Sequence, residues 1–158
     1  TPRLLLQVIG PYEEANTQIT STVIPLLEKA GFRVTLYQPE DFTTGFESVS
    51  QFRSKYDAVL YLANVENRSN ATTTRINWYT FFGQGNNIPW FVDEVPTVFA
   101  SLGNPYHLMD VPMVKTYINT YDNHQAVIEA LVAKILGKSD FKGVSPIDPY
   151  CGLMDARR

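Results

Sequence analysis

Apolar and amphipathic stretches alternate along the first part of the chain. Leu4–Ile9 is apolar except for Gln7 and stops before a Gly-Pro pair, which is typical of a strand buried on both faces of a sheet. From Glu13 to Ala30 the apolar residues recur every three or four positions, which predicts a helix. Pro25 lies inside this pattern and indicates either a kink or a later helix start. The pattern therefore predicts a strand followed by a helix.

The same alternation continues through the rest of the chain. Val49–Lys55 has the spacing of a short helix, whereas Ile76–Gly83 fits a strand and a helix equally well, so its state stays open. Lys138–Arg158 is interrupted by glycine and proline and is expected to be an ordered tail without a further element. Four further apolar runs predict strands, at Phe32–Tyr37, Tyr56–Ala63, Thr97–Ser101 and Val114–Tyr121.

The region from Val98 to Leu136 holds the clearest succession of elements. Its first strand gives way at Gly103 to an Asn-Pro loop, and its second is followed by Asp122-Asn123, which we expect to open a helix. Apolar residues recur at helical spacing as far as Leu136, and Gly137 is placed to end that helix. Strands separated by helices predict an α/β fold, a three-layer α/β/α sandwich with a mostly parallel sheet, in one domain of 158 residues.

In open parallel sheets, ligands bind outside the carboxyl ends of the strands, and this rule ranks the loops. The asparagine at position 104 precedes a proline, where the usual role of its side chain is to fix its own turn, so a turn role stands beside a binding role. Polar side chains of the loop Asn64–Arg75 could bind hydroxyl groups or pack against another domain, or simply be exposed to solvent. The loops that rank highest are Gly10–Tyr12, Asn64–Arg75, Gly103–His107 and Tyr121–Asn123.

The run Val98–Leu136 resembles the C-terminal domain of family 3 glycoside hydrolases, especially bacterial β-N-acetylglucosaminidases (β-hexosaminidases). In that domain a strand ending in Ser-Leu-Gly-Asn-Pro-Tyr, here Ser101–Tyr106, precedes a tyrosine-bearing strand and a helix rich in alanine and leucine. The resemblance implies that residues 1–158 form one α/β domain of a longer chain whose N-terminal catalytic barrel lies outside it. The barrel and, in the full enzyme, a carbohydrate substrate are then its partners.

The resemblance also implies what the enzyme does. The full-length protein is expected to hydrolyse terminal β-linked N-acetylglucosamine or a related β-glycoside with retention, and the isolated domain is expected to be inactive, because the nucleophilic aspartate of the family lies on the barrel. A non-enzymatic binding or regulatory module of flavodoxin-like architecture is the alternative, since fold alone does not fix function.

No catalytic residue is expected within the chain. In many family members a glutamate of this domain is the acid/base, whereas in the β-N-acetylglucosaminidase branch an Asp-His pair on a barrel loop takes that role. Asp93 and Glu94 precede the strand Thr97–Ser101 and should lie at the wrong edge of the sheet for catalysis. The candidates for contact with the substrate or the barrel are Asn104, Tyr106, His107, Arg68 and Arg75.

Composition and motifs weigh against several other functions. The formal net charge of −3 offers no basic stripe for nucleic acid, and no apolar run approaches the length of a membrane span. His107 and His124 have no zinc-ligand spacing, and Cys151 is the only cysteine. Gly83–Asn86 lacks the third glycine and the lysine of phosphate-binding loops. We therefore expect no metal, no cofactor, and neither nucleic acid nor a membrane as a partner.

Overall fold

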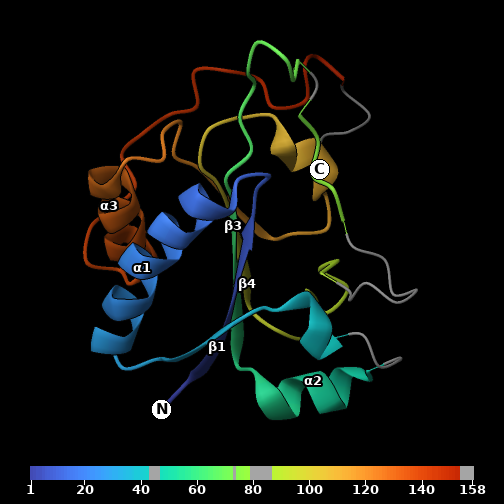
Figure 1. The fold of residues 1–158 in the computed structure, drawn as a ribbon, viewed down its shortest axis with the longest axis vertical. Coiled ribbons are helices and arrows are strands. Elements are labelled where there is room, and N and C mark those ends of the chain that lie inside the picture. The colour runs from blue at the N-terminus through green and yellow to red at the C-terminus, as the bar shows by residue number, and fades with distance from the viewer. Residues whose placement is uncertain (43–46, 73, 79–86, 154–158) are drawn as a thin grey trace.

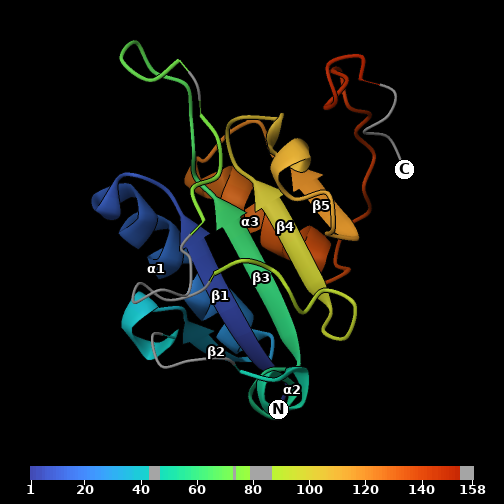
Figure 2. The ribbon, with the colours of Figure 1, turned by 90° about the vertical axis from the view of Figure 1, so that its right-hand side faces the viewer.

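A computed structural model of the chain describes residues 1–42, 47–72, 74–78 and 87–153, which form a parallel sheet with helices on its faces (Figures 1 and 2). The sheet has five strands in the order β2-β1-β3-β4-β5. The direction in which successive strands are added therefore reverses between β1 and β3, the point where α/β sheets of this order bind ligands. The strands are β1 (Arg3–Ile9), β2 (Arg33–Leu36), β3 (Ala58–Ala63), β4 (Thr97–Ser101) and β5 (Thr116–Asn119).

Two helices, α1 (Glu13–Lys29) and α3 (Gln125–Ile135), cover one face of the sheet. Both are amphipathic, and their apolar sides meet the side chains that alternate strand residues direct to this face. Leu6 and Leu62 of the sheet and Leu27 of α1 are fully buried in this core. Burial of this kind contributes roughly 1.5–3 kcal/mol for each large aliphatic side chain.

The opposite face of the sheet is covered by aromatic side chains and one short helix, α2 (Val49–Lys55). Phe52 of α2 stacks on Phe91 with ring centroids 4.1 Å apart, and Trp90 lies edge-on to Phe52. Trp78 likewise lies edge-on to the buried Tyr61. Both tryptophans thus pack against the core, as the aromatic residues of α/β domains usually do.

The one polar residue of the first strand has a partner in this second core. Gln7 is 2% exposed, and its amide donates a hydrogen bond to the hydroxyl of Tyr61 at 3.1 Å. That hydroxyl donates in turn to the carbonyl of Asn87 at 2.9 Å. A buried amide is costly unless it is hydrogen-bonded, so the bond from the Gln7 side-chain nitrogen offsets part of the cost of a polar residue in a central strand.

Several element boundaries differ from the predicted ones. The helix α1 begins at Glu13 and runs through Pro25, so a later start is wrong. The strand β5 is shorter than Val114–Tyr121, and α3 begins at Gln125 because Asp122 instead accepts a hydrogen bond from the amide of His124. Helix propensity and apolar spacing do not locate such ends, which depend on local hydrogen bonds.

Other predictions agree with the structure. Gly137 has a φ of +68° directly after α3, as predicted for a glycine that ends a helix. Residues 138–153 contain neither helix nor strand, and 154–158 lie outside the described residues. Ile76–Trp78 is neither strand nor helix, while the remainder of Ile76–Gly83 lies outside the described residues.

Candidate functional site

The loop after β3 organises the carboxyl edge of the sheet. It leaves the edge at Asn64 and projects beyond the ends of the other strands (Figure 2). Near its tip Arg68 and Ala71 form an isolated antiparallel bridge with N–H to carbonyl distances of 3.1 and 2.9 Å. Side chains from the loops after β1, β4 and β5 hold the base of this projection. We call residues 64–72 together with 74 and 75 the projecting loop.

Asn104, after β4, both fixes its own turn and holds the projecting loop. Its side-chain oxygen accepts a hydrogen bond from the amide of Tyr106 at 2.8 Å, which is the turn role typical of asparagine. Its side-chain nitrogen donates to the hydroxyl of Thr74 at 2.7 Å and to the oxygen of Asn67 at 3.3 Å. The turn role expected from the sequence is therefore present, and the same side chain also holds the projecting loop.

His107 is fully buried beneath the same loop. Its Nε2 lies 3.2 Å from the carbonyl of Thr74, which can only accept, so we assign the ring proton to Nε2. Its Nδ1 lies 2.7 Å from the hydroxyl of Ser101, whose single proton serves either Nδ1 or the carbonyl of Asn104. Burial lowers the pKa of His107, since the charged imidazolium loses its hydration there. His107 is buried and positions the projecting loop.

A second hydrogen-bond network lies at the point where the strand order reverses. Asn64 is 5% exposed, and its oxygen accepts a hydrogen bond from the amide of Asn123 at 3.0 Å. The same Asn123 amide lies 3.1 Å from a carboxylate oxygen of Glu66. In α1, Asn16 donates to the carbonyl of Gly10 at 2.9 Å. This network joins the loops after β1, β3 and β5.

The outer surface of the edge carries aromatic and cationic side chains. The guanidinium of Arg68 lies 4.0 Å from the centre of the Tyr12 ring, which is 44% exposed. Tyr106 and Tyr121 are also exposed, one on the loop after β4 and one on the loop after β5. Arg75 instead pairs with Asp110 at 2.8 Å and anchors the base of the projecting loop.

The five residues predicted to contact substrate or barrel thus all lie in this region, in different roles. Arg68 and Tyr106 are exposed on its surface, whereas Asn104, His107 and Arg75 hold the loops together. Sequence reasoning missed Asn16, Glu66 and Thr74, although each follows a buried strand or belongs to one of the ranked loops. Their roles depend on which loops meet, so spacing alone gave no signal for them.

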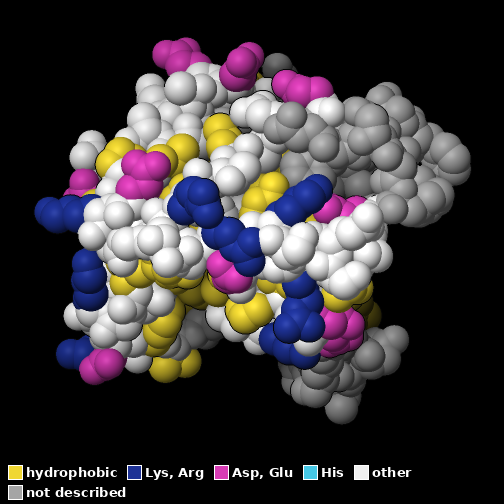
Figure 3. Space-filling model, turned by 90° about the horizontal axis from the view of Figure 1, so that it is seen from below, with side chains coloured by type: hydrophobic (Ala, Val, Ile, Leu, Met, Phe, Trp, Pro, Cys, Tyr) yellow, Lys and Arg dark blue, Asp and Glu magenta, His cyan; other side chains and the backbone are white. Residues whose placement is uncertain are grey.

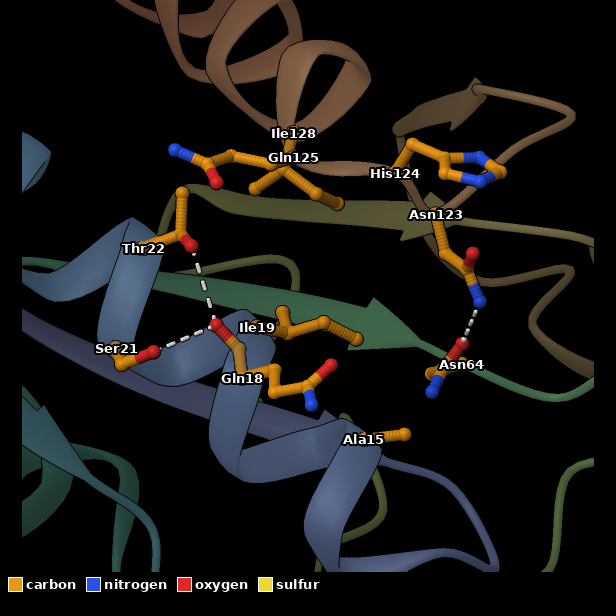
Figure 4. A pocket seen from close by; sticks show the side chains of 10 residues that line it. All are labelled: Ala15, Gln18, Ile19, Ser21, Thr22, Asn64, Asn123, His124, Gln125 and Ile128. Carbon is orange, nitrogen blue, oxygen red and sulfur yellow. Dashed lines mark hydrogen bonds between the residues drawn. The ribbon is translucent and has the colours of Figure 1, made fainter.

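A pocket of about 480 Å³ opens between α1 and α3, next to the second network (Figure 4). Amide and hydroxyl side chains line it above an apolar floor, with no carboxylate, lysine or arginine among the lining residues. Both hydroxyl groups of the lining are engaged within α1, since those of Ser21 and Thr22 donate to the carbonyl of Gln18. The lining residues are Ala15, Gln18, Ile19, Ser21, Thr22, Asn64, Asn123, His124, Gln125 and Ile128.

The amino edge of the sheet, seen in Figure 3, has a different chemistry. Lysine and arginine side chains gather there with acidic partners. Arg3 pairs with Asp57 at 2.8 Å and holds the pKa of that carboxyl well below its usual value. Asp93 lies 3.0 Å from Lys115, and its side chain is 77% exposed. Asp93 therefore lies at the edge expected from the sequence, away from the polar networks of the carboxyl edge.

Within residues 1–42, 47–72, 74–78 and 87–153, no group of three or more His, Cys, Asp or Glu side chains could hold a metal ion. Within those same ranges, none of the helices has the length and apolar character needed to cross a bilayer.

A parallel sheet in this strand order, with its polar networks at the carboxyl edge, defines an α/β domain of the doubly wound class. No family model matches the chain. It is 44% identical over 133 residues, 84% of its length, to a protein of Cellulomonas fimi named β-N-acetylglucosaminidase/β-glucosidase. The structure of β-glucoside phosphorylase BglX superimposes on 99% of the chain with a TM-score of 0.79 and 39% identity.

A family 3 β-N-acetylglucosaminidase of Paenibacillus shares the fold, with a TM-score of 0.53 at 18% identity over 90% of the chain. The chain belongs to glycoside hydrolase family 3 and corresponds to the C-terminal domain of its members. It spans only about a quarter of these relatives: 23% of the Cellulomonas protein and 28% of BglX.

Proposed function

We propose that this chain is the C-terminal domain of a longer retaining glycosidase that removes terminal β-linked N-acetylglucosamine or a related β-glycoside. The observation that carries the proposal is the 44% identity to a protein whose name gives both activities. Because the chain spans about a quarter of that relative, we assign the remaining length to an N-terminal catalytic barrel. The domain then buttresses the barrel and lends the projecting loop to the rim of its sugar site. The likeness to enzymes over nearly the whole chain does not favour a regulatory module.

The contacts of the carboxylates at the carboxyl edge of the sheet support a role for this domain outside the chemical step. A retaining glycosidase needs a nucleophile and an acid/base about 5–5.5 Å apart across the scissile bond. Glu66 accepts from Asn123, Asp110 pairs with Arg75, and Asp122 pairs with His124. Each of these carboxylates is engaged within its own loop contact, so we assign both catalytic carboxylates to the barrel.

The isolated 158-residue chain is expected to fold and to lack glycosidase activity. Its two cores lie within the chain, whereas the nucleophile of the proposed reaction does not. Release of p-nitrophenol from p-nitrophenyl β-N-acetylglucosaminide and from the matching β-glucoside measures this, with the longer protein as the positive control. Hydrolysis by the short chain alone would show that the chemistry lies here and would refute the assignment.

The projecting loop is the part of the domain best placed to reach a neighbouring sugar site. Its tip stands beyond the strand ends, while two hydrogen-bond networks and the ion pair from Arg75 to Asp110 fix its base. Preorganisation of this kind lowers the entropic cost of placing a loop against a ligand. Arg68 presents hydrogen-bond donors at the surface of the loop, and its guanidinium lies over the partly exposed ring of Tyr12, which together offer a sugar polar and apolar contact.

Replacing Arg68 with alanine in the longer protein is expected to raise KM about 3–10-fold with a smaller change in kcat, as loss of a binding contact does. Arg33 is the matched control, because it is an exposed arginine at the start of β2, at the far edge of the sheet. Steady-state kinetics of both variants show whether the projecting loop contributes to substrate binding. If Arg68→Ala and Arg33→Ala give the same KM as the unmodified protein, the projecting loop does not belong to the sugar site.

A second candidate reaction follows from the β-glucoside phosphorylase, which superimposes on 99% of the chain. In that case phosphate, rather than water, accepts the glycosyl group, and the product is a sugar 1-phosphate. The two reactions separate in one experiment, in which the longer protein is incubated with the aryl glycoside with and without inorganic phosphate. Free sugar alone indicates hydrolysis, and phosphate-dependent sugar 1-phosphate indicates phosphorolysis.

A further inference from the structure

The segment after α3 exposes apolar side chains that its own domain does not cover. Residues 138–153, which we call the tail, cross the top of the molecule in Figure 1 and pass beside β5, an edge strand, in Figure 2. Phe141 is 59% exposed, Val144 is 91% exposed and Leu153 is 48% exposed. Tyr121, on the loop from β5, adds an exposed ring next to the tail. The tail therefore adds almost nothing to either core.

The tail nevertheless has a defined course, set by local hydrogen bonds. The carboxylate of Asp148 accepts from the amides of Tyr150 and Gly152, both at 3.0 Å. The hydroxyl of Tyr121 lies 3.1 Å from that of Ser145 and joins the tail to the loop after β5. These contacts fix the backbone but leave the apolar side chains in water. Ordering a chain segment costs conformational entropy that such local bonds scarcely offset.

We propose that the tail is the docking strap of the domain: Phe141, Val144 and Leu153, with Tyr121, pack against the rest of the same polypeptide. This proposal rests on the proposed function, in which the chain is one domain of a longer enzyme. The occupant is that remaining part because the relatives are between three and four times as long as the chain, which covers only 23–28% of their length. Several exposed apolar side chains on one ordered segment typically mark such a contact.

The charges on the tail indicate that the contact is apolar rather than electrostatic. Lys138 and Lys142 are balanced by Asp140 and Asp148, and the charged groups lie between the apolar residues. Lys134, near the end of α3, is already engaged with the tail. Its ammonium lies 5.3 Å from the ring of Phe141 and donates a hydrogen bond to the carbonyl of Asp140. Docking should therefore persist at high salt, where contacts between exposed charges weaken.

Hydrogen–deuterium exchange compares the tail in the 158-residue chain and in the longer protein. We expect amides of residues 138–153 to exchange at least about tenfold more slowly in the longer protein, in low salt and in 0.5 M NaCl alike, because the docked strap opens rarely. Val144→Asp should abolish that protection and leave the melting temperature of the short chain unchanged. Ser139→Asp is the matched control, since it places the same charge at an exposed polar position of the tail and should leave protection intact.

Equal exchange in the two proteins would overturn the proposal, as would protection that Val144→Asp leaves intact. Analytical ultracentrifugation gives a further outcome: a dimer of the short chain that Val144→Asp dissociates would mean that a second copy covers the tail, which also overturns it. The test is separate from that of the enzyme assignment. If the longer protein has a protected tail but no glycosidase activity, the docking of the tail is supported and the proposed function is refuted.

Discussion

Replacing His107 with alanine is expected to lower the free energy of unfolding by about 2–4 kcal/mol. The imidazole is fully buried and joins the projecting loop, at the carbonyl of Thr74, to the end of β4, at the hydroxyl of Ser101. Its removal leaves a cavity and takes the donor away from the carbonyl of Thr74, while the hydroxyl of Ser101 keeps the carbonyl of Asn104 as a partner. Chemical denaturation of the 158-residue chain measures the loss. His124 is the matched control: its side chain is 81% exposed, so His124→Ala should change stability by no more than about 0.5 kcal/mol.

The same residue predicts how stability depends on pH. Burial lowers the pKa of His107 in the folded chain, below its usual value of about 6.5. As the pH falls through that value, the unfolded chain takes up a proton that the folded chain does not, so the free energy of unfolding decreases. The contribution is complete above about pH 6.5 and is lost towards the lower folded-state pKa. His107→Ala should remove this part of the pH dependence between pH 7 and 5. An unchanged profile would contradict the burial of a neutral imidazole.

Gly10→Ala is the other substitution with a large expected effect, a loss of about 1–3 kcal/mol. A Cβ at this position would lie 2.7 Å from the backbone carbonyl of Asn64 and 2.5 Å from the side-chain oxygen of Asn16. The backbone carbonyl belongs to the residue that leaves β3, so it cannot move without disturbing the sheet. The expected result is overpacking at the point where the strand order reverses, with the projecting loop displaced.

Gly143→Ala provides the control for Gly10→Ala, because nothing lies within 4 Å of a Cβ there. Its expected effect on the short chain is within about 0.5 kcal/mol. Thermal unfolding of the two variants compares them directly. In the longer protein, Gly10→Ala should in addition raise KM, since it shifts the base of the projecting loop. Equal stability of both variants would mean that the loops after β1 and β3 do not approach as closely as the structure indicates.

The order of strands and helices followed from the sequence because hydrophobic periodicity is local. The continuous run Leu4–Ile9 and the helical repeat after it needed no tertiary information, and Gly137 marked the end of α3. The boundaries of elements that are set by single hydrogen bonds did not follow from the sequence. The start of α3 depends on the contact between Asp122 and the amide of His124, which no periodicity reveals.

The candidate site likewise has a part that the sequence predicts and a part that it does not. The sequence by itself determined which loops lie at the carboxyl edge, because in a parallel sheet that edge follows from strand direction alone. Only the tertiary structure decided which side chains meet there. Asn123 reaches Asn64 from 59 positions away, although β4 lies between β3 and β5, because the chain after β5 turns back towards α1 to begin α3. The tertiary structure also buries His107 and leaves Arg68 exposed. Burial depends on which segments the connections between strands place over a residue rather than on the residue's type.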